Sequence, residues 1–182
     1  FTAIQASMQQ KIELESESLM DQPLVTNGSF SLGKARRIDD ATGRYVEFCK
    51  GSLPAGYSLA GLKIVLDCAN GATYNAAPKV FKELGAQVIT MANTPNGLNI
   101  NEQCGSTHMD AVRARVVEEK ADIGIALDGD GDRVLLVDAN GEIVDGDEIV
   151  YIIARYRQQT GQGCNGVAGT QMSNLGLEIA LR

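Results

Sequence analysis

Hydrophobic and polar positions follow a helical period in the N-terminal part of the chain. Between residues 3 and 19, Ile4, Met8 and Ile12 recur on one face and three glutamates lie opposite them, which predicts an amphipathic helix. Residues 21–33 are rich in turn-forming residues, and we expect a loop there.

A second helix is predicted over residues 41–50, with Tyr45, Phe48 and Cys49 buried along one face. Proline and glycine residues then interrupt the pattern between residues 52 and 61. This interruption indicates a boundary before the next run of regular structure.

From residue 63 onward, short apolar runs alternate with helical patterns. The runs predict strands at residues 63–66, 87–91, 122–127, 133–137, 142–144 and 167–170. The helical patterns predict buried faces made of Ala77, Val80, Phe81 and Leu84, of Met109, Val112, Val116 and Val117, and of Ile149, Ile152, Ile153 and Tyr156, with another helix after Ser173. Strands that alternate with helices are typical of a three-layer α/β/α domain with a mostly parallel sheet.

Turn and capping residues indicate where some of these elements begin. The Asn-Gly pair at residues 140–141 predicts a hairpin. Thr107 and Asp110 are expected to form a capping box, and Asp147 to cap the helix that follows it. We interpret Asp145 and Asp147 as part of this helix start rather than as a second metal site.

Composition and charge argue against several classes of protein. The formal net charge is −7 and no cluster of lysines and arginines offsets it, so we expect no nucleic-acid partner. The chain has no apolar stretch of about 18 residues, so we expect no membrane partner. Four widely spaced cysteines and a single histidine argue against a zinc site and favour reduced thiols in a cytoplasmic protein.

The strongest candidate for chemistry is the acidic loop, residues 128–133, in which Asp128, Asp130 and Asp132 alternate with glycines. In an extended segment, alternate residues point to one side, so the three carboxylates can converge. Converging like charges raise one another's pKa unless a cation lies between them. Oxygen ligands without histidine or thiolate favour Mg²⁺ or Ca²⁺.

The position of this loop supports a metal site over its alternative interpretation, a simple polar turn. The loop directly follows the predicted strand, and open α/β sheets bind ligands at the carboxyl ends of their strands. Arg133 comes next, and its planar guanidinium suits bidentate binding of phosphate. A calcium EF-hand is excluded, because it needs glycine at the position of Arg133 and glutamate at the position of Ala139.

Several stretches together resemble the α-D-phosphohexomutases, and among them the members that act on glucosamine phosphates. The resemblance is carried by residues 126–133 and 141–147, with support from residues 43–50, 67–74, 95–101 and 169–176. It covers most of the chain from about residue 34 onward. The segment 126–133 looks like the metal loop of that family.

The resemblance implies a piece of a four-domain enzyme. Residues 1–40 would be the remainder of domain 1, residues 41–163 the metal-binding domain 2, and residues 164–182 the start of domain 3. The chain does not start with methionine and ends inside a helical pattern, which also predicts a fragment. The family's phosphorylated serine, in a Ser-His-Asn-Pro context, has no counterpart here, so we expect this chain alone to be inactive.

The implied reaction is the reversible interconversion of glucosamine 6-phosphate and glucosamine 1-phosphate through a phosphoserine and a bisphosphate intermediate. Mg²⁺ held by Asp128, Asp130 and Asp132 would bind the phosphoserine, and Arg133 would be a catalytic residue that stabilises the transferred group. The expected partner is a hexosamine phosphate, and the full-length enzyme would be a candidate homodimer.

Other functions remain open at this stage. A phosphomannomutase or phosphoglucomutase of the same family would use the same loop. A phosphatase of the haloacid-dehalogenase type would use Asp128 as nucleophile and Asp130 as acid and base, although that family requires threonine or valine where Asp132 stands. A non-enzymatic module stabilised by a metal is a third alternative.

Overall fold

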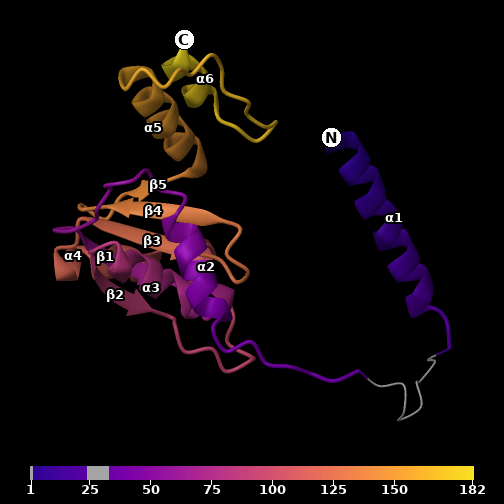
Figure 1. Ribbon diagram of the computed structural model, residues 1–182. Coiled ribbons are helices and arrows are strands. Elements are labelled where there is room, and N and C mark those ends of the chain that lie inside the picture. The colour runs from indigo at the N-terminus through magenta and orange to yellow at the C-terminus, as the bar shows by residue number, and fades with distance from the viewer. Residues whose placement is uncertain (1, 24–32) are drawn as a thin grey trace. The chain divides into compact units, whose positions relative to one another are not determined.

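The computed structural model describes residues 2–23 and 33–182 and separates the chain into two compact units, Phe1–Ile38 and Asp39–Arg182 (Figure 1). The first unit contains helix α1, Thr2–Met20, which confirms the predicted helix. The side chains of residues 11–20 are exposed within this chain. The side chains of Ile4 and Met8, and most of the predicted loop at residues 21–33, lie outside the described part.

The second unit is built on a sheet of five strands in the order β2-β1-β3-β4-β5. Its elements along the chain are α2 (Ala41–Lys50), β1 (Lys63–Asp67), η2 (Ala72–Tyr74), α3 (Ala76–Glu83), β2 (Gln87–Met91), η3 (Gly105–Thr107), α4 (Asp110–Glu119), β3 (Ile123–Leu127), β4 (Val134–Asp138), β5 (Ile143–Val144), α5 (Gly146–Gln159) and α6 (Leu175–Leu181). Five of the predicted strands are therefore present, with bounds within about a residue of those expected.

The sheet is parallel in one half and antiparallel in the other. Strand β1 pairs in parallel with β2 and β3, whereas β4 pairs antiparallel with β3 and with β5. The prediction of a mostly parallel sheet therefore holds only for the first three strands. The loop between β3 and β4 is too short for a crossover, so β4 has to run back beside β3.

Helices cover both faces of the parallel half, which confirms the three-layer α/β/α class. On one face, Val65 of β1 packs with Val112 and Val116 of α4. On the other face, Ile64 and Leu66 form a second cluster with residues of α3. Alternate residues of β1 thus supply both cores, as a strand buried on both faces requires.

The prediction for the buried face of α2 was wrong. Val46 is only 1% exposed, but Tyr45 and Phe48 are 58% and 75% exposed and stack on each other. Helix α2 also contacts α3 through Lys50, whose Nζ lies 2.7 Å from a carboxylate oxygen of Glu83. A helical pattern indicates that a face is apolar, but the neighbouring elements decide which side turns inward.

Further predictions of buried residues fail in the two later helices. Val117 of α4 is 53% exposed, although Met109, Val112 and Val116 are buried as expected. In α5, Ile152, Ile153 and Tyr156 are also largely exposed, and Ala154 is the buried residue. Only the part of each helix that faces the sheet or α6 within this chain is covered.

The helix starts also differ from the prediction. The cap of α5 is Asp145, not Asp147: its Oδ1 accepts from the backbone N–H of Glu148, whose carboxylate in turn accepts from the N–H of Asp145. Asp147 instead accepts a hydrogen bond from the backbone N–H of Asn174 at 2.7 Å. Thr107 does not cap α4, because it lies in the 3₁₀ turn η3 and its hydroxyl contacts the ring of His108.

Residues 167–170 do not form a strand in the structure, contrary to the prediction, whereas helix α6 follows as expected. A strand needs a neighbour for its backbone hydrogen bonds. Among the described residues none pairs with this segment. No helix in the described ranges combines the length and apolar character needed to cross a membrane.

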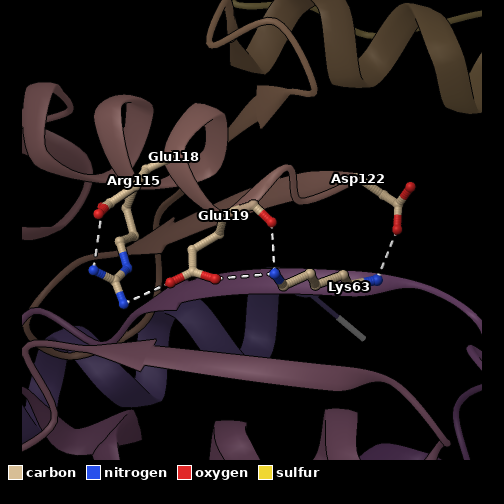
Figure 2. Close-up of polar contacts among 5 residues, drawn as sticks. All are labelled: Lys63, Arg115, Glu118, Glu119 and Asp122. Carbon is tan, nitrogen blue, oxygen red and sulfur yellow. Dashed lines mark hydrogen bonds and ion pairs between the residues drawn. The ribbon is translucent and has the colours of Figure 1, made fainter.

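A polar network fixes α4 to the amino-terminal end of β1 (Figure 2). Lys63 Nζ donates to the backbone oxygen and a carboxylate oxygen of Glu119, and the backbone N–H of Lys63 donates to Asp122. Arg115 pairs with both Glu118 and Glu119. The hydrogen bond from Lys63 lowers the pKa of Glu119.

This network predicts a specific dependence of stability on pH. Because the pKa of Glu119 is lower in the folded state, its contribution is present above its ordinary pKa of 4.5 and is lost as the pH falls through the lowered value. Urea unfolding of the Glu119→Gln variant should therefore show a weaker loss of stability below about pH 5 than the wild type. Parallel pH profiles for the two proteins would contradict this assignment.

The packing of β3 predicts the effect of a single added methyl group. A Cβ on Gly124 would lie 2.7 Å from Cγ2 of Val116 and 3.0 Å from Cβ of Val137, both buried. We expect Gly124→Ala to lower the free energy of unfolding by about 1–3 kcal/mol. Gly146→Ala, which meets no atom within 4 Å in the first turn of α5, is the control and should not destabilise the protein in the same urea titration.

Candidate metal centre

The acidic loop lies at the carboxyl edge of the sheet, between β3 and β4. The parallel strands β1 and β2 end at the same edge, so the segments that follow them lie beside this loop. Its ends are joined by a backbone hydrogen bond from Asp128 to the carbonyl oxygen of Arg133, at 3.3 Å. The six residues therefore form a closed turn rather than an extended segment.

Asp128 is the buried member of the loop, with only 1% exposure. Its Oδ1 accepts from the backbone N–H groups of Gly131 and Arg133, each at 3.1 Å, and its Oδ2 accepts from Nε of Arg133 at 2.7 Å. These hydrogen bonds lower the pKa of Asp128 to about 2, and the bond from the backbone N–H of Arg133 has the largest effect. The carboxylate is thus fixed in position and charged at neutral pH.

Asp130 and Asp132 are exposed, and their carboxylates converge with that of Asp128. One oxygen from each of the three residues lies within 4.8 Å of the others. The charge of Asp130 is the main cause that raises the pKa of Asp132. This repulsion and the all-oxygen donor set fit a hard divalent cation such as Mg²⁺.

Arg133 lies against the same carboxylates. Its Nε is 2.7 Å from Asp128 and 3.6 Å from Asp132, and its side chain remains 69% exposed. The contact with Asp128 raises the pKa of the guanidinium further. Arg133 is therefore a permanent positive charge that a ligand at this edge can reach.

The two glycines of the loop are required for different reasons. Gly131 has φ +78°, which favours glycine. Gly129 instead has no room for a side chain, since its Cβ would lie 2.7 Å from Ile100 and 2.8 Å from the amide of Asn101. The loop is thus packed closely against the segment after β2.

Sequence reasoning missed Asp67, a fully buried carboxylate at the end of β1. Its Oδ1 accepts from the N–H of Ala69 at 2.8 Å and its Oδ2 from the N–H of Gly105 at 2.9 Å. Ala69 and Asn70 both have positive φ values, which are strained for residues other than glycine. A charged residue that closes an apolar strand was the signal that could have indicated this anchor.

Asparagine side chains brace the segment between β2 and η3. Asn96 Oδ1 accepts from the N–H groups of Leu98 and Asn99, and Asn99 donates to the carbonyl oxygen of Thr94. Asn70 Oδ1 accepts from the N–H of Thr94. These bonds hold in place the segment that packs against Gly129.

The cysteines are free thiols, as expected. Burial raises the pKa of Cys68 to about 11 and also raises that of Cys104. Both thiols are therefore protonated at neutral pH and are poor metal ligands. Asp145 and Asp147 do not belong to the acidic cluster, because both take part in hydrogen bonds around α5.

Comparison with known proteins matches this geometry to one family. Residues 44–141 match the phosphoglucomutase/phosphomannomutase α/β/α domain II. Phosphoglucosamine mutases of Pseudomonas paraeruginosa and Teredinibacter turnerae are 59% and 60% identical over 171 and 170 residues, which make up 94% and 93% of this chain. The chain spans 38% of the length of each of these relatives.

A solved structure is also similar. The crystal structure of a phosphoglucomutase/phosphomannomutase family protein from Burkholderia thailandensis has a TM-score of 0.56 and 28% identity, covering 65% of this chain and 26% of that one. The matched family segment includes strands β1 to β4, helices α3 and α4 and the whole acidic loop. The chain therefore belongs to the phosphoglucomutase/phosphomannomutase family, of which it contains the α/β/α domain II.

Proposed function

We propose that this chain carries the metal centre of a phosphosugar mutase that interconverts glucosamine 6-phosphate and glucosamine 1-phosphate. The observation that carries the proposal is the convergence of three carboxylates within 4.8 Å beside an exposed arginine. The two phosphoglucosamine mutases that are about 60% identical support the choice of substrate. Phosphomannomutase or phosphoglucomutase activity is the alternative within the same family.

Asp128, Asp130 and Asp132 would hold a Mg²⁺ ion, which when bound neutralises charge on a phosphoryl group. The protein residues have separate tasks. Asp128 is fixed by three hydrogen bonds and provides a preorganised ligand, while the exposed Asp130 and Asp132 can adjust to the ion. Preorganised charges of this kind stabilise a transition state without reorganisation during the reaction.

Arg133 would bind the phosphoryl group being transferred. Its Nε is held by Asp128, which orients the guanidinium while most of the side chain stays exposed. The planar donor group then suits two oxygens of one phosphate. A phosphoserine outside these 182 residues would supply the phosphoryl group, through a bisphosphate intermediate.

The family match and the residue at position 132 argue against the phosphatase alternative. Phosphatases of the haloacid-dehalogenase type require threonine or valine where Asp132 stands, whereas residues 44–141 match the phosphoglucomutase/phosphomannomutase domain II. The proposal therefore assigns Asp128 to metal binding and orientation, not to covalent catalysis.

For the complete protein we propose three domain portions in this chain, with boundaries near residues 40 and 163. We also propose a cytoplasmic location, a hexosamine phosphate as substrate, and a homodimer of the full-length enzyme. The large apolar side chains exposed on α2 and α5 are compatible with surfaces covered by other parts of a longer chain.

The metal assignment predicts a loss of cation binding on removal of one charge. Asp132→Asn should weaken Mg²⁺ or Mn²⁺ binding by at least about tenfold, since loss of an outer-shell partner alone typically costs about 10–100-fold. Calorimetric titration measures this effect. The control, Asp110→Asn in the first turn of α4, should bind like the wild type; equal affinity in all three proteins would refute the site.

The mutase assignment predicts different products from a phosphatase. A full-length enzyme containing this chain should convert glucosamine 6-phosphate to glucosamine 1-phosphate without net release of inorganic phosphate. Arg133→Lys should lower kcat by about 10²-fold or more, because a point charge replaces the bidentate donor. Stoichiometric release of phosphate, or a phosphorylated Asp128 found by mass spectrometry, would instead establish the phosphatase.

A further inference from the structure

The acidic loop packs against the segment that follows β1, residues 71–73. The backbone N–H of Ala72 donates to the carbonyl oxygen of Gly129 at 2.8 Å. A Cβ on Gly71 would lie 2.2 Å from that same oxygen, so the two backbones are in direct contact. This part of the interface contains no side chain that could be changed without moving the backbone.

Thr73 adds a side-chain contact to this interface. A Cβ on Gly131 would lie 2.5 Å from Cγ2 of Thr73, so the methyl group packs directly against the glycine between Asp130 and Asp132. Thr73 is the middle residue of the short 3₁₀ turn η2, which fixes its backbone. Thr73 and Asp130 also line the same groove between α2 and α3.

The hydroxyl group of Thr73 does not explain the presence of this residue. In the described ranges, Thr73 Oγ1 is one of two buried side-chain oxygens without a hydrogen-bond partner, the other being Oδ1 of Asn101. Asn101 also touches the acidic loop, at Gly129. The hydroxyl lies beside the thiol of Cys68 and lowers the pKa of that thiol, but a thiol is a weak hydrogen-bond partner, whereas the methyl group makes a close contact with Gly131.

We propose that Thr73 is a positioning residue of the metal centre, which acts through its γ-methyl group by supporting Gly131 and so fixing the separation of Asp130 and Asp132. This inference rests on the proposed metal binding. Without the methyl group, Gly131 gains freedom on the side facing η2, and its positive φ no longer has a steric support. The two exposed carboxylates then sample wider separations and bind a cation less tightly.

Two conservative substitutions separate the methyl group from the hydroxyl group. Thr73→Ser keeps the hydroxyl and removes the methyl, whereas Thr73→Val keeps the methyl and removes the hydroxyl. In calorimetric titration with Mn²⁺, Thr73→Ser should bind measurably more weakly than the wild type, because the exposed carboxylates are less well positioned. Thr73→Val should match the wild type and unfold at an equal or higher temperature.

Hydrogen exchange at the amides of residues 129–132, measured without a cation, tests the support of the loop independently. Exchange should be faster in Thr73→Ser and unchanged in Thr73→Val. Wild-type affinity and exchange in Thr73→Ser, or an equal loss of affinity in both variants, would overturn the inference. A wild type that binds no Mn²⁺ would refute the proposed metal centre, and unchanged exchange in Thr73→Ser would then separately refute the support by Thr73.

Discussion

Repulsion among three carboxylates is the constraint on which the site depends. With one oxygen from each within 4.8 Å, these groups oppose one another in any solvent-exposed loop. The protein offsets part of this electrostatic repulsion locally, since Asp128 accepts hydrogen bonds from two backbone N–H groups and from the Arg133 side chain. What remains is the charge of Asp130 and Asp132, and this excess provides the attraction for a cation.

Asp128 is buried and fixed by hydrogen bonds, whereas Asp130 and Asp132 are exposed, and keeping such close neighbours in these different positions requires a stiff backbone. The acidic loop gains stiffness from close packing against two segments. Gly71 and Thr73 contact it from the segment after β1, and Ile100 contacts it from the segment after β2. The buried carboxylate of Asp67 orders the turn that carries Thr73, because it accepts from Ala69 and Gly105. Burying a polar group is costly unless it is hydrogen-bonded, and here the two N–H groups offset part of that cost.

Much of this arrangement could be predicted from the sequence, because it depends on local pattern. The apolar runs located the five strands of the sheet, and the alternation of aspartate and glycine located the loop. The face of α2 could not be predicted, since its orientation depends on packing against elements distant in the chain, among them α3, whose Glu83 pairs with Lys50. The strand predicted at residues 167–170 is absent for a similar reason, because an apolar run becomes a strand only beside a partner strand.

The supporting residues of the site were harder to predict than its ligands. Asp67 and Thr73 lie more than fifty positions before the acidic loop, and their types carry no strong signal alone. Only the parallel pairing of β1 with β3 brings their segment beside the loop. A sequence pattern can reveal ligands that lie close together in one segment, whereas a support drawn from the next strand depends on the topology.

The two edges of the sheet use charge in opposite ways. At the amino-terminal end of β1, Lys63 and Arg115 pair with Glu118 and Glu119, while Asp122 accepts from the backbone N–H of Lys63 (Figure 2). At the carboxyl end, three aspartates face a single arginine. Balanced pairs need no further partner and favour the folded state, whereas an unbalanced cluster raises the free energy of the protein until a cation binds. Because the unbalanced cluster lies where the parallel strands end, the charges around Lys63 take no part in the proposed metal binding, and a mutation there can change stability without removing a metal ligand.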